Sequence, residues 1–174
     1  MKIFETKRLI VKSLDKTHKS DFIELLSDPK VINPIPQPQF SEAAILERFN
    51  KNLNITESVF ARERTVCGVF LKDNPEMIGL CLFLTNEELD KEIGYRFKYK
   101  NWGNGYTTEL AEALISFYFS KSEITKITAD VTIANKGSLK ILNKFFKPVR
   151  DFYNDRDQTM DRRFAIHKKE WIKR

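Results

Sequence analysis

The sequence is poor in cysteine and histidine. Of its 174 residues only Cys67 and Cys81 are cysteines, and both stand in apolar, strand-like surroundings. Two such thiols do not suggest the disulfide framework of a small secreted domain, and with only His18 and His167 present no cluster of metal ligands is visible. We therefore expect two buried free thiols, no metal site and a reducing compartment, the cytoplasm.

Long apolar runs are also missing. No stretch of about twenty apolar residues occurs, and residues 2–12 carry too many charges for a signal peptide. This predicts a soluble protein with no membrane partner. The chain does contain 14 phenylalanines and 41% hydrophobic residues, which suffice for one core, so residues 1–174 are expected to form a single domain.

A strand, a pair of glycines and a helix follow one another from Glu92 onward. Gly103 and Gly105 lack a Cβ and can adopt positive φ, so the backbone between them can approach an anion closely. Apolar residues at helical spacing predict a helix from about Thr107, whose N-terminus would present free N–H groups to a diphosphate. The alternative is a tight turn without a ligand. The loop lacks the Gly-Lys-Ser/Thr of a nucleotide-hydrolysing loop and the third glycine of a dinucleotide-binding one.

A second strand and helix follow downstream. Residues 127–133 alternate as a strand that ends near Asn135, and Ser138 begins an apolar face at helical spacing. Asn135 is either part of a site or an ordinary N-cap, because asparagine is among the best residues to accept a bond from the first N–H groups of a helix.

Together these segments resemble the GNAT superfamily of acetyl-CoA-dependent N-acetyltransferases. Lys100-x-x-Gly103-x-Gly105 is similar to the (Arg/Gln)-x-x-Gly-x-(Gly/Ala) pyrophosphate loop of that superfamily, and Asn135-x-x-Ser138 resembles the ribosomal-protein-alanine acetyltransferase (RimJ/RimL-like) branch. The resemblance implies acetyl-CoA as the acetyl donor. It also implies the following cofactor-binding residues: Phe97, Lys98, Tyr99, Lys100, Gly103, Asn104, Gly105, Tyr106, Thr107 and Asn135.

Three positions depart from the family pattern. Leu142 stands where many members have a tyrosine that acts as general acid, which leaves Ser138 beside the thioester sulfur as the candidate. Phe146-Lys147-Pro148 replaces the usual Gly-Phe after the helix. Lys100 stands where arginine or glutamine is usual, and a lysine contacts phosphate as a point charge without the bidentate fork of arginine.

The order of predicted elements agrees with the GNAT order. We expect strands over 7–12, 59–71, 77–85, 92–98, from 126, 149–153 and 159–167, and helices over 18–26, 41–53, from 107 and from 136. The predicted fold class is α/β (α+β): a mixed, mostly antiparallel sheet of about seven strands with four helices, splayed between the fourth and fifth strands. The net charge of +6 is spread along the chain, which favours a solvated surface that steers an anionic cofactor over a specific nucleic-acid partner.

The implied reaction is acetyl transfer to a primary amine. Glu92, acting through water, is the candidate base, with an exposed carboxylate at a strand start as the alternative, and Glu109 is a weaker candidate whose charge favours the helix N-terminus. An N-terminal α-amine has a pKa near 8 and a lysine amine a pKa of about 10.4, so a carboxylate base favours the α-amine of a protein or peptide. A small amine, such as an antibiotic or polyamine, and a non-catalytic acyl-CoA-binding module are the alternatives. A homodimer is compatible with the sequence.

Overall fold

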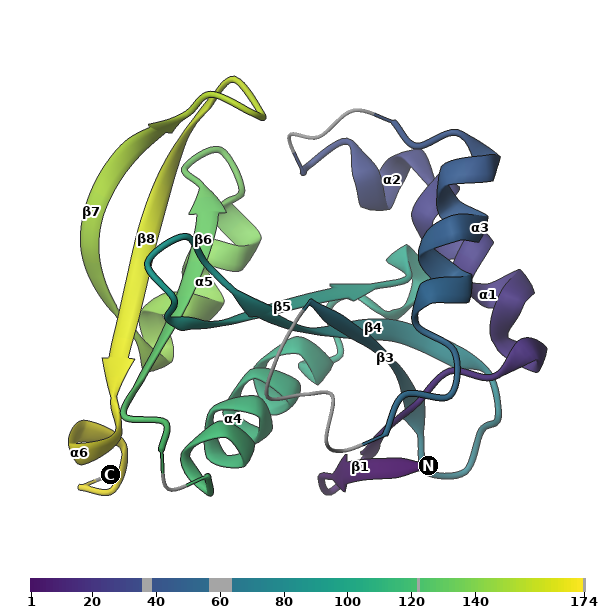
Figure 1. Ribbon diagram of the computed structural model, residues 1–174, viewed down its shortest axis with the longest axis horizontal. Coiled ribbons are helices and arrows are strands. Elements are labelled where there is room, and N and C mark those ends of the chain that lie inside the picture. Colours follow the sequence, from purple (N-terminus) through teal and green to yellow (C-terminus); the bar gives the residue numbers. More distant parts are fainter. Residues whose placement is uncertain (36–38, 57–63, 122, 174) are drawn as a thin grey trace.

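The computed structural model describes residues 1–35, 39–56, 64–121 and 123–173. In these ranges the strands form one sheet of eight in the order β1-β2-β3-β4-β5-β6-β8-β7 (Figure 1). The strands are β1 (Lys2–Glu5), β2 (Leu9–Lys12), β3 (Thr65–Leu71), β4 (Met77–Thr85), β5 (Lys91–Phe97), β6 (Lys126–Thr132), β7 (Lys147–Asn154) and β8 (Thr159–His167). The α-helices are α1 (Lys19–Ser27), α2 (Pro29–Ile32), α3 (Glu42–Lys51), α4 (Tyr106–Phe119), α5 (Lys136–Phe145) and α6 (Lys168–Trp171), with 3-10 turns η1 (Lys16–His18) and η3 (Tyr99–Asn101).

The sheet opens between β5 and β6. Every other neighbouring pair is antiparallel, whereas β5 and β6 run parallel and pair only at Lys91 with Ile127 and at Glu92 with Thr128. Beyond Glu92, β5 stays paired with β4 and β6 stays paired with β8, so the two strands diverge (Figure 1). The predicted fold class and its splay are confirmed.

Three short elements account for the difference between the predicted and the observed number of elements. β1 and α6 have four residues each, which is too short for a hydrophobic period to show. α2 also has four residues and begins at Pro29, which occupies the first turn of the helix after the N-cap Asp28. Of the strand expected over 59–71, residues 59–63 lie outside the described residues and the described part begins at Thr65.

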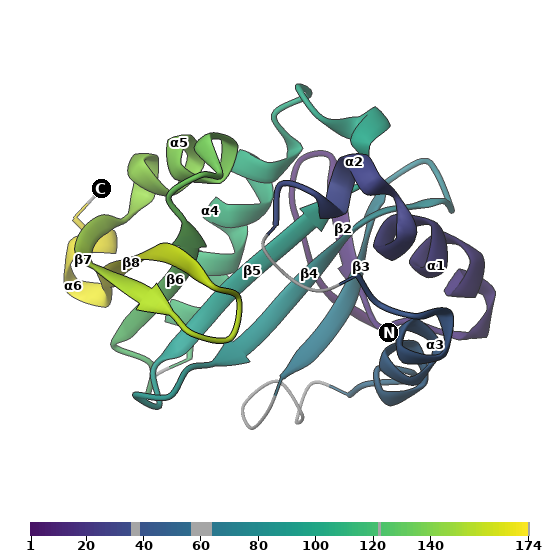
Figure 2. The same ribbon diagram turned by 90° about the horizontal axis from the view of Figure 1, so that it is seen from above.

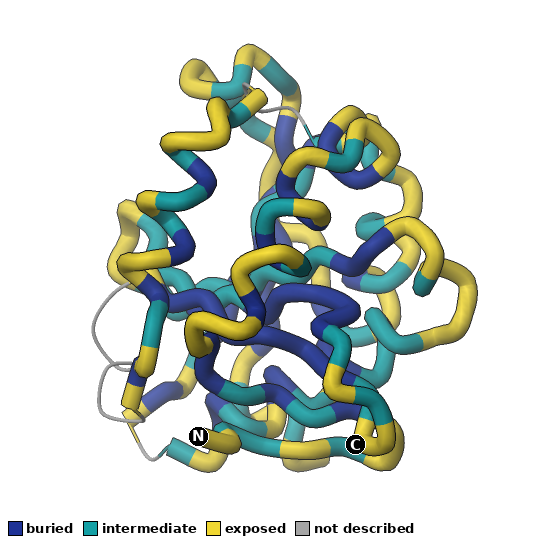
Figure 3. The backbone as a smooth tube through the Cα atoms, turned by 90° about the vertical axis from the view of Figure 1, so that its right-hand side faces the viewer, coloured by how far each residue is buried: buried dark blue, intermediate teal, exposed yellow. Residues whose placement is uncertain are grey.

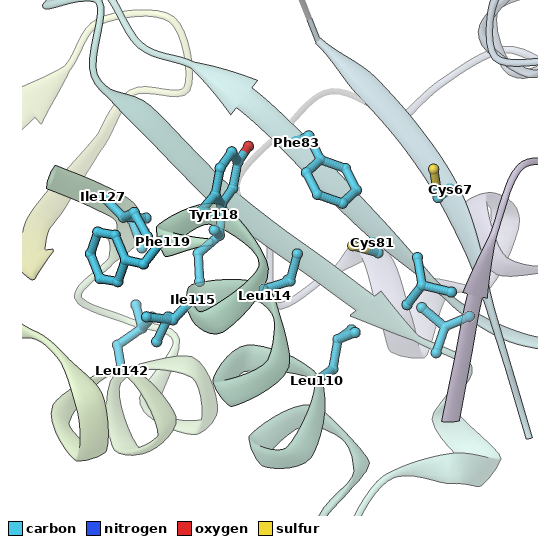
Figure 4. Close-up of a cluster of buried hydrophobic side chains, with 14 of the residues drawn as sticks. Cys67, Cys81, Phe83, Leu110, Leu114, Ile115, Tyr118, Phe119, Ile127 and Leu142 are labelled. Carbon is cyan, nitrogen blue, oxygen red and sulfur yellow. The ribbon is translucent and has the colours of Figure 1, made fainter. Parts of the chain in front are cut away.

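Two hydrophobic clusters cover the two faces of the sheet. α4 packs on one face, where Leu110, Leu114 and Tyr118 lie against β4 and β5 (Figure 4). α1 and α3 pack on the other face (Figure 2). Phe22 and Phe49 are buried there. Side chains alternate along a strand, so β5 directs Ile93, Tyr95 and Phe97 toward α4 and directs Glu92, Gly94 and Arg96 toward the opposite face.

The two cysteines face each other across neighbouring strands. Cys67 of β3 pairs in register with Cys81 of β4, and both thiols are free and fully buried among apolar side chains (Figure 4). Figure 3 shows that the buried parts of the backbone, in dark blue, gather in the interior of the molecule. The expectation of two buried free thiols is confirmed. Among the described residues no helix is long and apolar enough to span a membrane.

Candidate active site

The glycine loop has the backbone that the sequence predicted. Gly103 and Gly105 both adopt positive φ, +79° and +77°, and a Cβ added at Gly103 would have no other atom within 4 Å. The loop therefore follows a path that other residues rarely adopt and leaves open space above it. α4 begins at Tyr106, one residue before the predicted start.

The N-terminus of α4 has no side-chain cap. Gly105 occupies the N-cap position and makes no side-chain hydrogen bond, whereas α3 is capped by Ser41 and α5 by Asn135. The first N–H groups of this 14-residue helix are thus left to an external acceptor, and the helix dipole favours an anion there. Such a helix start is suited to binding a phosphate or diphosphate group.

Arg8 supports this loop from the N-terminal part of the chain. Its Nη1 donates to the carbonyl oxygen of Asn104 at 3.0 Å, and its guanidinium lies 4.6 Å from the centre of the Tyr106 ring. Its Nε donates to Glu109 at 2.7 Å, and Thr6 donates to the same carboxylate. Glu109 therefore holds Arg8 and the loop in place. Sequence reasoning missed Arg8 because nothing near it in the chain marks a role 96 residues away.

The two lysines of the predicted cofactor site are engaged elsewhere. The side chain of Lys98 is only 3% exposed, and its Nζ donates to Asp21 at 2.7 Å and to Glu24 at 2.6 Å. Burial alone would lower the pKa of Lys98, but these carboxylates raise it above its ordinary value. Lys100 pairs with Glu76, which Lys98 also contacts.

The backbone of Lys98 is also engaged. Its N–H donates to Ile78 at 2.9 Å and its carbonyl accepts from Asn101 at 2.9 Å. Lys98, which the family resemblance implied as a cofactor-binding residue, therefore offers neither its side chain nor its peptide groups to a ligand, because partners on α1, on β4 and in the following turn use them. Tyr99 lies in η3 and is 47% exposed. Neither residue lines a cavity described below.

The free backbone groups lie on the other edge of β5, the edge that faces away from β4. In an antiparallel pair alternate residues bond to the partner strand, and the bond from Lys98 to Ile78 sets this phase. Tyr95 and Phe97 accordingly direct their N–H and C=O groups toward β6, from which β5 has diverged. The carbonyl of Phe97 accepts from Trp102 Nε1 at 2.9 Å.

Two cavities meet where the strands diverge. One of about 410 Å³ runs from Gly103 and Thr107 to the start of α5, and the other of about 670 Å³ lies between β5 and the β7–β8 hairpin. The residues that line both are Ile35, Tyr95, Arg96, Asn135 and Ser138. A long thin ligand can therefore lie in the smaller cavity with its end exposed to a second ligand in the larger one.

Asn135 and Ser138 both lie at this junction. The side-chain oxygen of Asn135 accepts from the N–H of Ser138 at 3.1 Å, so Asn135 caps α5. Both side chains are half-buried. The side-chain oxygen of Asn135 is therefore used as an N-cap, as the alternative interpretation predicted. This hydrogen bond fixes the backbone of Ser138 at the junction.

Tyr95 is a residue that sequence reasoning missed. Leu142 is buried in the core, so α5 offers no phenol there, but β5 brings the phenol of Tyr95 to the same junction. Its hydroxyl is buried and has no hydrogen-bond partner among the residues that the structure describes. Burial raises the pKa of Tyr95 well above its ordinary value, against a smaller opposite effect of the Ser138 hydroxyl, so the phenol keeps its proton.

Glu92 lies in the larger cavity on the face of β5 opposite Tyr95. Burial raises the pKa of Glu92 to about 7, and the negative charge of Asp130 acts in the same direction. A carboxyl group with this pKa can accept a proton near neutral pH. The alternative of an exposed carboxylate at a strand start is wrong, because Glu92 is half-buried.

The open sheet and the glycine loop before α4 define a protein of the acetyl-CoA-dependent acetyltransferase class. The sequence matches the acetyltransferase (GNAT) domain family over residues 8–145, and the chain belongs to that family. It is an N-acetyltransferase that uses acetyl-CoA as acetyl donor.

Similar proteins cover the whole chain. An uncharacterized N-acetyltransferase p20 of Bacillus licheniformis is 24% identical over 100% of this chain and 98% of its own. A GNAT-family acetyltransferase structure from Bacillus anthracis has a TM-score of 0.81 at 22% identity, covering 97% of this chain and 99% of that one. The structure of RimL, a ribosomal L7/L12 α-N-protein acetyltransferase, in complex with coenzyme A has a TM-score of 0.76 at 17% identity and covers 96% and 98% of the two chains.

Proposed function

We propose that the chain acetylates the N-terminal α-amine of a protein or peptide, within the RimJ/RimL-like branch of the family. The observation that carries the proposal is Glu92, a carboxyl group with a pKa of about 7. It lies in the larger cavity, which meets the smaller cavity at Ser138. Such a base matches an α-amine with a pKa near 8 far better than a lysine amine with a pKa of about 10.4. The Asn135-x-x-Ser138 spacing supports the branch.

The donor would be held by backbone more than by side chains. The peptide groups from Gly103 to Thr107 and the start of α4 would bind the diphosphate, and the cavity that runs to Ser138 would hold the pantetheine arm. Acetyl-CoA supplies the activated acetyl group at the junction of the two cavities.

The residues at the junction divide the chemistry between the two faces of β5. Glu92, through a water molecule, takes the proton that the amine loses as its nitrogen bonds to the acetyl carbon. The N–H of Phe97 on the free edge of β5 stabilises the oxyanion, a contribution of about 3 kcal/mol in comparable sites. The hydroxyl of Ser138, which lies beside the protonated phenol of Tyr95, donates a hydrogen bond to the departing sulfur.

Competition between two peptides tests the acceptor. One peptide has a free N-terminus, the other a blocked one, and each contains a single lysine. We expect the free peptide to be acetylated faster, at its α-amine, because the ionisation difference alone favours that amine by about 3 kcal/mol. Mass spectrometry of the products locates the acetyl group. Faster acetylation of the blocked peptide would contradict the proposal, and acetylation of neither would favour a small amine.

Ser138→Ala is expected to lower kcat about tenfold or more, roughly 1.4 kcal/mol, with little change in affinity for CoA. The reason is that the hydroxyl acts on the leaving sulfur, while the Asn135 cap needs only the backbone N–H of residue 138. Single-turnover rates and calorimetry with CoA measure the two effects. Tyr95→Phe, which removes only the buried hydroxyl beside Ser138, is measured in parallel. A wild-type rate in Ser138→Ala would leave Ser138 as a helix-start residue only.

A further inference from the structure

The larger cavity contains many charged side chains, and most of the acidic ones are already bonded within the protein. Asp157 accepts from Arg156 at 2.6 Å, and Asp161 accepts from Asn154 at 2.7 Å. The remaining pairs join Arg163 to Asp130 at 2.6 Å and to Glu87 at 2.8 Å. These carboxylates are therefore occupied by partners on β7, on β8 and in the turn between them, and they offer little free negative charge to a ligand.

Arg96 differs from these groups. Its side chain is half-buried and lines both cavities, yet no hydrogen bond or ion pair joins its guanidinium to another group in the described part of the chain. Arg64, at the rim of the larger cavity, is likewise without a carboxylate partner among the described residues. Among the described residues, the unpaired charge that reaches the junction of the two cavities is thus positive, whereas the unpaired carboxylates of Glu92 and Asp155 line the larger cavity only.

The surroundings of Arg96 destabilise the positive charge of its guanidinium. Burial lowers the pKa of Arg96 to about 10, and the positive charges of Arg64 and Arg48 act in the same direction. A buried charge is normally retained only where an opposite charge or several hydrogen bonds compensate for its lost hydration. An anionic group bound in the cavity would provide that compensation.

We propose that Arg96, assisted by Arg64, binds an anionic group of the acceptor, so that the acceptor is a primary amine that also carries a carboxylate. This inference rests on the proposed function, because it assumes that the amine enters the cavity that contains Glu92. The planar guanidinium is suited to bidentate contact with a carboxylate. The carboxylate has two sources: an acidic side chain near the N-terminus of a peptide, or the α-carboxylate of a free amino acid.

The spacing along β5 suits a two-point contact. Glu92 and Arg96 lie on the same face of the strand with Gly94 between them, and about 7 Å separates successive residues on one face. Gly94 adds no side chain, and a Cβ there would lie 3.2 Å from that of Leu82, so the floor of the cavity is closely packed and flat. An acceptor can therefore lie along the strand between the base and the arginine. A polyamine would place a second cation beside Arg96, which disfavours that acceptor class.

Matched acceptors test the inference. For the peptide source, two peptides with a free N-terminus differ only by aspartate or asparagine at the second residue. For the amino-acid source, an amino acid is compared with its amide. We expect the carboxylate-bearing member of at least one pair to have a kcat/KM about tenfold higher or more, chiefly through KM, and Arg96→Gln to remove that preference.

Two further variants separate binding from folding and from general electrostatics. Arg96→Lys keeps the charge without the fork and should retain part of the preference. Arg162→Gln removes a positive charge whose side chain pairs with Asp151 on the outer strand β7, and it should change nothing. Calorimetry with CoA verifies that each variant keeps its cofactor site.

The outcomes distinguish this inference from the proposed function. Equal kcat/KM within both pairs, or an unchanged preference in Arg96→Gln, would overturn the anion subsite while leaving acetyl transfer to an α-amine intact. A wild-type enzyme that acetylates none of the four acceptors while binding CoA would overturn both. Preference within the peptide pair only, or the amino-acid pair only, supports the inference and identifies the source of the carboxylate.

Discussion

Replacing Glu92 by glutamine is expected to lower kcat/KM for an amine acceptor about 100-fold or more while leaving the affinity for CoA unchanged. Glutamine keeps the shape of the side chain but cannot accept the proton that the amine loses. Glu92 lies on the acceptor side of β5, away from the glycine loop, so the cofactor site should be unaffected. Steady-state kinetics and calorimetry on the same preparation measure both quantities.

The pH profile should change in the same variant. Burial is the main cause that raises the pKa of Glu92 to about 7, Asp130 and Glu87 add to it, and Arg163 and Arg156 oppose it. The base is active when deprotonated, so kcat/KM of the wild type should fall as the pH drops through about 7. In the glutamine variant kcat/KM should no longer fall near pH 7. Its pH dependence should reflect only the ionisation of the amine, with a pKa near 8 for an α-amine.

Asp155→Asn is the matched control for this experiment. Asp155 is another carboxylate of the same cavity, and its removal should leave both the rate and the profile as in the wild type. A glutamine variant with a wild-type rate would show that another group accepts the proton. So would a glutamine variant whose kcat/KM still falls as the pH drops through about 7.

Replacing Gly105 by valine is expected to abolish detectable binding of CoA while the fold survives. The φ of +77° at this position is strained for any residue with a Cβ, by about 1–2 kcal/mol, and β-branching adds to the strain. The Cβ of the new side chain would lie 3.6 Å from Nη2 of Arg8, whose Nη1 bonds to the loop at Asn104. Calorimetry with CoA and a thermal unfolding curve are the measurements.

Leu89→Val adds the β-branching part of this strain at another position of positive φ. Leu89 has a φ of +63° in the turn between β4 and β5 and is 82% exposed. Both variants should lose some stability, but only the Gly105 variant should lose CoA. An unchanged affinity in a folded Gly105→Val protein would falsify the assignment of the loop as the diphosphate site.

The sequence predicts those features that depend on interactions between residues close together in the chain. The paired glycines, the start of α4 and the capped helix at Asn135 depend on neighbouring residues, and all were predicted within one residue. Lys98 could not be placed, because its main partner Asp21 is 77 residues away and a lysine near a phosphate loop looks like a cofactor ligand.

Tyr95 shows a second limit of the sequence. Its strand was predicted correctly, and alternation gives the face of the side chain. Its position beside Ser138, however, depends on the divergence of β5 from β6, which leaves room for a phenol between the strand and α5. The unpartnered charge of Arg96 is equally invisible in the sequence, because it follows from which carboxylates other side chains have already occupied.

The opposed cysteines of β3 and β4 have a practical consequence for spectroscopy and labelling. Both thiols are 0% exposed, and burial raises the pKa of Cys67 to about 12, so the native protein presents no thiolate to an alkylating reagent from either residue. A cysteine introduced on the surface would therefore be the single reactive thiol of the folded chain. A fluorophore or spin label could be placed on the β7–β8 hairpin or near Ile35 without first removing a native sulfur.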